Sequence, residues 1–157
     1  KIGEVPLRII KQIVIHCAAT KANMDIGVAE IRQWHMNRGW VDVGYHYVIR
    51  RDGTIEEGRP EEQIGAGVRG FNKHTIHICL VGGLDDDMQP ENNFTHKQLI
   101  AAKQLAKGLV HKYETLTTIR PAVVGHRDFP GVKKACPCFD VVPWYYEMIP
   151  DLDEENT

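Results

Sequence analysis

The sequence predicts an α/β fold: a single mixed β-sheet flanked by helices. Two β-branched runs, at 9–16 and 75–83, alternate along the chain with amphipathic helical patterns at 28–38 and 95–113. A hairpin signal at 41–58 adds an antiparallel pair to strands that would otherwise be parallel. The length of 157 residues suits one domain over 1–157, with an irregular lead-in at 1–8 and a frayed tail at 150–157.

The first half of the chain supplies a strand, a helix and the hairpin. "IIKQIVIH" at 9–16 barely alternates, which is typical of a central strand covered on both faces. The helix at 28–38 repeats apolar residues at spacings of three and four, and Gly39 is placed to end it. In "VDVGYHYVIRRDGTIEEG", Asp52-Gly53 marks the tight turn because this dipeptide tolerates positive φ.

The second half supplies another buried strand, a long helix and a short closing segment. "TIHICLVGG" follows a glycine-rich loop at 59–73 and reads as a strand. Thr95 and Gln98 form the capping-box pattern at the start of a helix that we expect to run to about Tyr113. "RPAVVGH" predicts a last strand, and "FDVVPWYYEMI" predicts a short helix or turn broken by Pro143.

Charge and hydropathy exclude several classes of function. The net charge of −2 and the dispersed lysines and arginines argue against a nucleic-acid partner or an acidic membrane surface. No apolar stretch approaches the roughly 20 residues that span a bilayer. Four cysteines in a chain of this size indicate free thiols or a metal site rather than a disulfide scaffold. We expect a monomer by default.

Candidate metal ligands lie where the strands end. His16 closes the first strand and His126 the last, and open α/β sheets place their sites at such ends. Strand alternation puts His16 and Cys17 on opposite faces, with Cys17 on the face of the core residues. Two imidazoles and the thiolate of Cys136 would give zinc three protein ligands and an open fourth position for water, which is typical of catalytic sites.

Other interpretations of the same residues remain open. Cys136 and Cys138 could complete a closed four-ligand site with both histidines, although their spacing is tight for one metal. A redox pair is disfavoured because the exchange motif has two residues between its cysteines. Cys79 reads as a small core residue. Any single histidine at a strand end is usually an ordinary loop residue.

Two more residues have both a structural and a catalytic interpretation. Tyr45 and Tyr47 alternate with His46 along the expected strand, where sheet packing is the simpler role. A phenol near a metal-bound water could instead act as a hydrogen-bond partner or acid–base group. Lys134 is by default a solvated charge, but two residues from a thiolate ligand it could stabilise an oxyanion.

Four stretches together resemble one family. "IVIHCAAT", "EIRQWHMNRGWVDVGYHYVIRRDGTIEEGR", "ICLVGG" and "GHRDFPGVKKACPCFD" are similar to the zinc N-acetylmuramoyl-L-alanine amidases, which include phage lysozymes of the amidase type and the peptidoglycan-recognition proteins. The likeness covers most of residues 10–146. It implies a mixed sheet with flanking helices and a zinc cleft. It also implies hydrolysis of the amide between the lactyl group of N-acetylmuramic acid and L-alanine.

The resemblance assigns a role to each candidate residue. The zinc ligands of the family fall on His16, His126 and Cys136, its catalytic tyrosine on Tyr45 and its lysine on Lys134. The substrate would be peptidoglycan or a muropeptide. Synthesis in the cytoplasm and action on the cell wall follow as expectations, since no export signal is visible in a chain that begins without Met.

The sequence also departs from the family pattern. Many relatives carry a histidine in the loop before the central strand, where "GAGVRGFN" has Gly67, and His77 stands where glycine is common. Cys138 adds a thiol beside the expected ligand. The two rivals to the amidase are a non-catalytic peptidoglycan-binding module, which typically lacks the thiolate, and a small interaction protein stabilised by zinc with four protein ligands.

Overall fold

A five-stranded mixed sheet organises the molecule. The computed structural model describes residues 7–147. The strand order is β4-β3-β5-β1-β7, in which β4 alone runs antiparallel to its neighbour. The strands are β1 (Gln12–Cys17), β3 (Tyr47–Ile49), β4 (Ile55–Glu57), β5 (Thr75–Leu80) and β7 (Ala122–Gly125). A separate parallel pair joins β2 (Thr20–Lys21) to β6 (Gly83–Leu84). The α/β fold with a mixed sheet is therefore confirmed.

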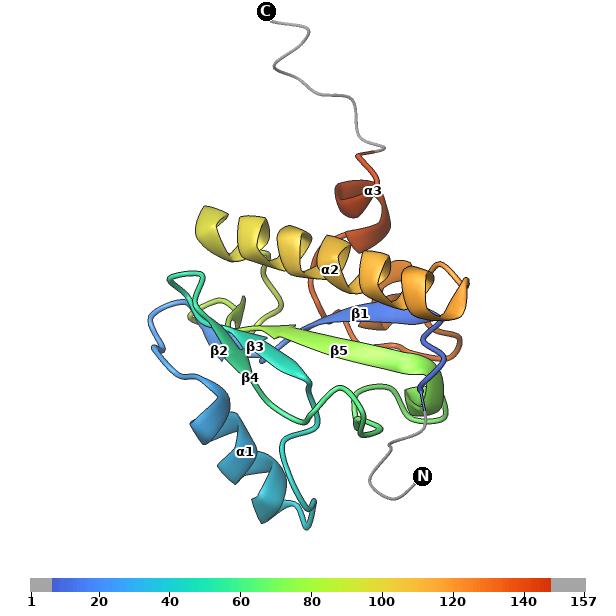
Figure 1. The fold of residues 1–157 in the computed structure, drawn as a ribbon. Coiled ribbons are helices and arrows are strands. Elements are labelled where there is room, and N and C mark those ends of the chain that lie inside the picture. The colour runs from blue at the N-terminus through green and yellow to red at the C-terminus, as the bar shows by residue number, and fades with distance from the viewer. Residues whose placement is uncertain (1–6, 148–157) are drawn as a thin grey trace, which may run out of the picture.

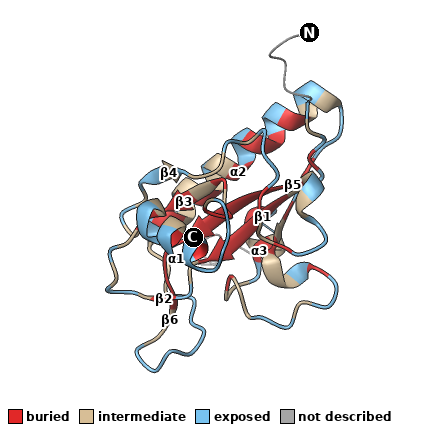
Figure 2. Ribbon diagram, turned by 90° about the horizontal axis from the view of Figure 1, so that it is seen from below, coloured by how far each residue is buried: buried red, intermediate tan, exposed pale blue. Residues whose placement is uncertain are grey.

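Helices cover the two faces of the sheet unequally. The long helix α2 (His96–Thr117) crosses one face with the short α3 (Val141–Tyr145) beside it, while α1 (Val28–Asn37) lies against the other (Figure 1). The central strands are buried along their length, and α2 turns one buried side toward them (Figure 2). None of the described helices is long and apolar enough to cross a membrane.

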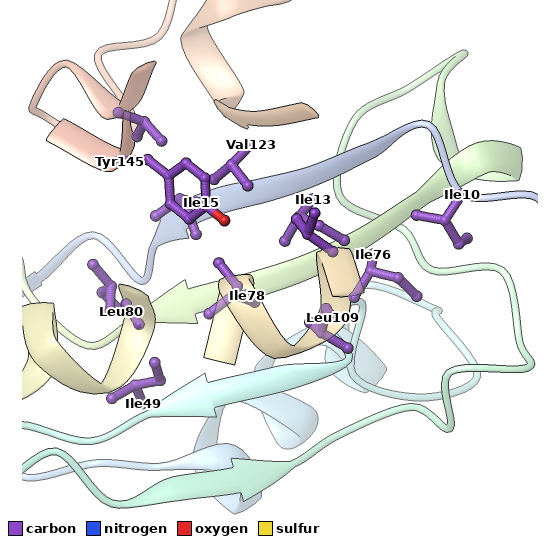
Figure 3. Close-up of a cluster of buried hydrophobic side chains, with 14 of the residues drawn as sticks. Ile10, Ile13, Ile15, Ile49, Ile76, Ile78, Leu80, Leu109, Val123 and Tyr145 are labelled. Carbon is purple, nitrogen blue, oxygen red and sulfur yellow. The ribbon is translucent and has the colours of Figure 1, made fainter. Parts of the chain in front are cut away.

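The main core lies between the sheet and α2. Alternate residues of β1 and β5 point to this face, and α2 contributes the stripe of small and aliphatic residues that meets them (Figure 3). The cluster includes Ile13, Ile15, Ile76, Ile78, Leu80, Ala102, Ala106, Leu109 and Val123. The opposite face holds a smaller cluster around Ile31 and Cys79, which confirms Cys79 as a core residue. Position along β1 and β5 therefore decides which side chains are left for the site.

The expected elements exist, with shifted boundaries. The strand β1 begins at Gln12, three residues later than expected, although the backbone N–H of Lys11 already donates to the carbonyl of His74. The hairpin turns at Gly53 with φ 89° as predicted. The capping box of Thr95 and Gln98 is present, and α2 continues past Tyr113 to Thr117.

Pro143 does not break the closing helix. It is the third residue of α3, in the first turn, where the amide hydrogen that proline lacks has no partner within the helix. The expectation of a break at this residue was therefore wrong.

Arg8 ties the start of the described chain to the loop before β5. Its two terminal nitrogens donate hydrogen bonds of 2.8–3.1 Å to the backbone oxygens of Glu61, Gln63, Asn72, Lys73 and Thr75. Leu7 and Arg8 carry no regular secondary structure, as expected for a lead-in, while 1–6 and the expected tail at 150–157 lie outside the described residues. Arg8 therefore has an irregular backbone, but its side chain is fixed to the rest of the molecule by hydrogen bonds.

Candidate metal centre

Three potential metal ligands meet at the carboxyl ends of β1 and β7. His16 is the fifth residue of β1, His126 directly follows β7, and Cys136 lies in the loop after it. One ligand atom from each lies within 4.8 Å of the other two, and within the described residues this is the one such group. The structure therefore brings together the three residues that the sequence singled out.

Hydrogen bonds explain how the loop delivers Cys136. Gly125 donates its amide hydrogen to Asp128 at 2.7 Å, which fixes the turn through His126. Arg127 then donates its backbone N–H to the carbonyl of Cys136 at 2.9 Å. Because this bond joins residue 127 to residue 136, it folds the intervening loop back and sets the cysteine beside the histidine.

The sulfur of Cys136 and the ring of His16 suit a metal. The backbone N–H of Cys17 donates to Cys136 Sγ at 3.2 Å, which holds the sulfur next to the end of β1. Burial lowers the pKa of His16 well below its usual range, helped by the nearby His77 and His126. A neutral imidazole keeps a lone pair for a ligand bond. Two imidazoles and a thiolate are ligands that zinc accepts.

Cys138 lies outside the group. Its Sγ faces the carbonyl of Gly83 at 3.4 Å and the Sγ of Cys17 at 4.0 Å. All four cysteines are free. The arrangement of the described residues therefore offers three protein ligands, and not the closed four-ligand alternative.

Tyr45 borders the metal group, but not as a strand residue. Its ring centroid lies 5.0 Å from that of His16, and it precedes β3, which begins at Tyr47. Tyr47 instead donates to Glu61 and packs against the main core, whereas Tyr45 packs with the cluster on the α1 side. The expectation that both tyrosines share a face was wrong, because residues 44–46 do not follow the strand alternation.

His35 holds Tyr45 from α1. The ring of His35 lies 5.4 Å from that of Tyr45, and its Nδ1 accepts the backbone hydrogen of Gly44 at 2.8 Å. Burial and the nearby thiols raise the pKa of Tyr45 well above its usual range. The phenol is therefore protonated and can donate a hydrogen bond.

Lys134 lies at the junction of two hollows. It lines a small cavity of about 200 Å³ together with Tyr45, His126 and Cys136. It also lines a groove of about 940 Å³ that runs from His126 across the loop at 66–72. The groove carries further cations, Arg38, Arg69 and Lys133, so it suits an anionic ligand.

Sequence reasoning missed a set of buried polar groups behind His16. His77 Nδ1 lies 2.8 Å from His16 Nε2, and Thr75 Oγ1 lies 2.9 Å from His77 Nε2. His46 accepts the backbone hydrogen of His77 through its Nδ1. His77 had been noted only as a departure from a family pattern. The parallel register that pairs Val14 with His77 would have revealed the contact, but it cannot be read from the sequence.

Comparisons with known proteins point to one family. The family model described as N-acetylmuramoyl-L-alanine amidase matches residues 6–139. The endolysin of Enterobacteria phage K11 is 47% identical over 133 residues, which cover 85% of this chain and 83% of the endolysin.

Two solved structures of amidases from Clostridium intestinale share the fold. The endolysin amidase LysCS has a TM-score of 0.67 at 30% identity, covering 83% of this chain and 76% of its own. The amidase LysC has a TM-score of 0.69 at 28% identity, covering 96% of this chain and 87% of its own. The chain therefore resembles cell-wall amidases over nearly its whole described length.

Proposed function

The chain belongs to the N-acetylmuramoyl-L-alanine amidase family and is a peptidoglycan amidase, and we propose that it acts with a zinc ion held by His16, His126 and Cys136. The reaction is hydrolysis of the amide between N-acetylmuramic acid and L-alanine. The observation that carries the zinc proposal is the approach of two imidazoles and a thiol to within 4.8 Å. When bound, zinc would supply a Lewis acid that polarises a carbonyl and makes water nucleophilic near neutral pH.

Lys134 and Tyr45 take the remaining chemical roles in this proposal. The ammonium of Lys134 lies in the same cavity as the ligands, where it can stabilise the negative oxygen that develops when the amide carbon becomes tetrahedral. Tyr45 carries a protonated phenol in that cavity and orients the attacking water by hydrogen bonding. The groove beside Lys134 would hold the rest of the substrate, with its cations facing the carboxylates of the stem peptide.

The binding module without catalysis is the weaker alternative. Its typical members lack the thiolate ligand, whereas Cys136 is present here and lies beside His16 and His126. We further propose that the protein is made in the cytoplasm, acts on the cell wall as a monomer, and binds neither nucleic acid nor membrane. Light scattering, which measures the molar mass in solution, tests whether the protein is a monomer.

Removing one ligand tests the zinc proposal. We expect Cys136→Ala to lose stoichiometric zinc, measured by atomic emission, and to lose clearing of cell-wall suspensions. Chelator should abolish clearing by the unaltered protein, and zinc should restore it. Mass analysis of digested muropeptides should show a free lactyl carboxylate and a released L-alanine amine.

Cys138→Ala is the matched control, because Cys138 is a second thiol two residues away that faces Gly83 instead of the ligands. It should retain both zinc and clearing. Zinc-loaded Cys136→Ala with undiminished turnover would contradict the assigned ligand set.

A further inference from the structure

We propose that His77 is a positioning residue for His16: a hydrogen-bonded chain from Phe71 through Thr75 and His77 holds the first zinc ligand in one tautomer and one orientation. The inference rests on the zinc site proposed above. It gives a function to a buried histidine that lies outside the group of three ligands and lines neither hollow at the site.

The direction of each hydrogen bond follows from the end of the chain. Thr75 Oγ1 lies 3.0 Å from the carbonyl oxygen of Phe71, which can only accept, so the hydroxyl hydrogen points there. The same oxygen must then accept from His77 Nε2, 2.9 Å away. His77 therefore carries its hydrogen on Nε2.

The second step transfers this constraint to His16. His77 is fully buried, and its ring nitrogens contact the hydroxyl of Thr75 and the imidazole of His16, neither of which has a negative charge to balance an imidazolium. A neutral ring with its hydrogen on Nε2 keeps a lone pair on Nδ1. That lone pair faces His16 Nε2 at 2.8 Å, which must donate. The neutral ring of His16 then has its own lone pair on Nδ1. The geometry thus selects Nδ1 of His16 for the metal.

The glycine loop leaves the space that the ring of His77 needs. A Cβ placed on Gly67 would lie 2.3 Å from His77 Nδ1, and one on Gly65 would lie 2.9 Å from His77 Cδ2. Neither glycine has a positive φ, so what excludes a side chain there is space rather than backbone conformation. The two departures noted in the sequence, Gly67 and His77, therefore meet at one place in the fold.

His46 fixes His77 from the other side. Its Nδ1 accepts the backbone N–H of His77 at 3.0 Å, and its Nε2 lies 2.8 Å from the carbonyl of Gln63. The rings of His46 and His77 are stacked with an interplanar angle of 10°. His77 is thus held at its backbone, at both ring nitrogens and on a ring face. Partners that orient a metal-binding histidine typically change metal affinity 10–100-fold when removed.

Zinc affinity and histidine NMR test the proposal. We expect His77→Ala to bind zinc about 10–100-fold more weakly in competition with a chromophoric chelator. Thr75→Val should weaken zinc binding because it keeps the shape but loses the acceptor for His77 Nε2, and Thr75→Ser should restore it. Gly67→Ala should weaken zinc binding without altering any group that bonds to His16.

Thr20→Val is the matched control for loss of a buried hydroxyl. Thr20 Oγ1 accepts the backbone hydrogen of Gly82 and is not part of the chain to His16. This variant should lose some stability in urea unfolding yet bind zinc as the unaltered protein does. In ¹⁵N NMR of the zinc-loaded protein, His16 should be metallated at Nδ1 and carry a slowly exchanging hydrogen on Nε2.

The outcomes separate this inference from the proposed function. If the unaltered protein fails to bind zinc, the proposed zinc site is wrong. If it binds zinc but His77→Ala binds equally well, or His16 is metallated at Nε2, the positioning role of His77 is wrong while the zinc site stands.

Discussion

At the scale of single residues, the site depends on a few groups that act at different distances from the reacting atoms. His16, His126 and Cys136 are proposed to touch the metal, while Lys134 and Tyr45 face the cavity in which the amide would be broken. Substitutions of the two kinds of residue should therefore have different effects. Loss of a proposed ligand should remove the metal, whereas loss of Lys134 or Tyr45 should lower turnover and leave the metal bound.

Lys134→Ala tests this separation. We expect the turnover number to fall about 10²-fold, the typical cost of removing a donor to a developing oxyanion, while zinc content stays near normal. Steady-state kinetics on a purified muropeptide and metal analysis measure the two effects. Lys107→Ala, an exposed lysine on α2, should leave both unchanged. A large loss of zinc in Lys134→Ala would mean that the lysine supports the ligands instead.

Sequence reasoning identified the three proposed ligands but not the residues that we propose orient His16. Strand alternation alone separated His16 from Cys17, since neighbouring strand residues face opposite sides. Strand alternation could not place Tyr45, because β3 begins two residues later, at Tyr47. The catalytic interpretation of Tyr45 was left open beside sheet packing, and only the resemblance to a family favoured it. The role of His77 could not be predicted, because its contact with His16 depends on the pairing of two strands that lie 61 residues apart in the sequence.

At the scale of elements, the start of α2 anchors the helix to the sheet. Thr95 Oγ1 accepts from the amide of Gln98 and donates to the carbonyl of Arg51 at 2.7 Å. The side chain of Gln98 is fully buried and donates to the carbonyls of Ile49, the last residue of β3, and Val81, which directly follows β5. The capping box was visible in the sequence, whereas its bonds to the hairpin and β5 were not.

Removing this cap should cost stability without affecting the chemistry. We expect Thr95→Ala to lower the free energy of unfolding by about 1–2 kcal/mol, since both an N-cap and a bond to the hairpin are lost. Urea denaturation measures the change. Thr117→Ala is the matched control in the last turn of α2, where the hydroxyl donates back to Tyr113 and adds little. Equal losses in the two variants would contradict the anchoring role.

At the scale of the whole molecule, buried histidines make stability depend on pH. Burial lowers the pKa of His35 and of His46 to about 4, and it also lowers the pKa values of His16 and His77 well below their usual range. These rings are neutral in the folded protein but take up protons in the unfolded chain as the pH falls below about 6.5. Stability contributed by them is therefore complete above that pH and declines toward pH 4.

We expect His35 and His46 alone, whose pKa values lie at about 4, to cost the metal-free protein at least about 3 kcal/mol of unfolding free energy between pH 6.5 and pH 5. Each depressed histidine contributes a slope of up to about 1.4 kcal/mol per pH unit, and most carboxylates remain ionised over this range. Urea unfolding in the presence of chelator measures the slope. A stability that is flat over this interval would mean that the rings are protonated, or exposed, in the folded state.

The five carbonyls gathered by Arg8 have a practical consequence for anyone who shortens this protein. They belong to the segment 61–75, which also contains the glycines packed over His46 and His77. Removal of Arg8 would take away these five hydrogen bonds, and we expect the segment 61–75 to loosen and expose the buried rings of His46 and His77 to solvent. A shortened version of the enzyme should therefore keep Arg8.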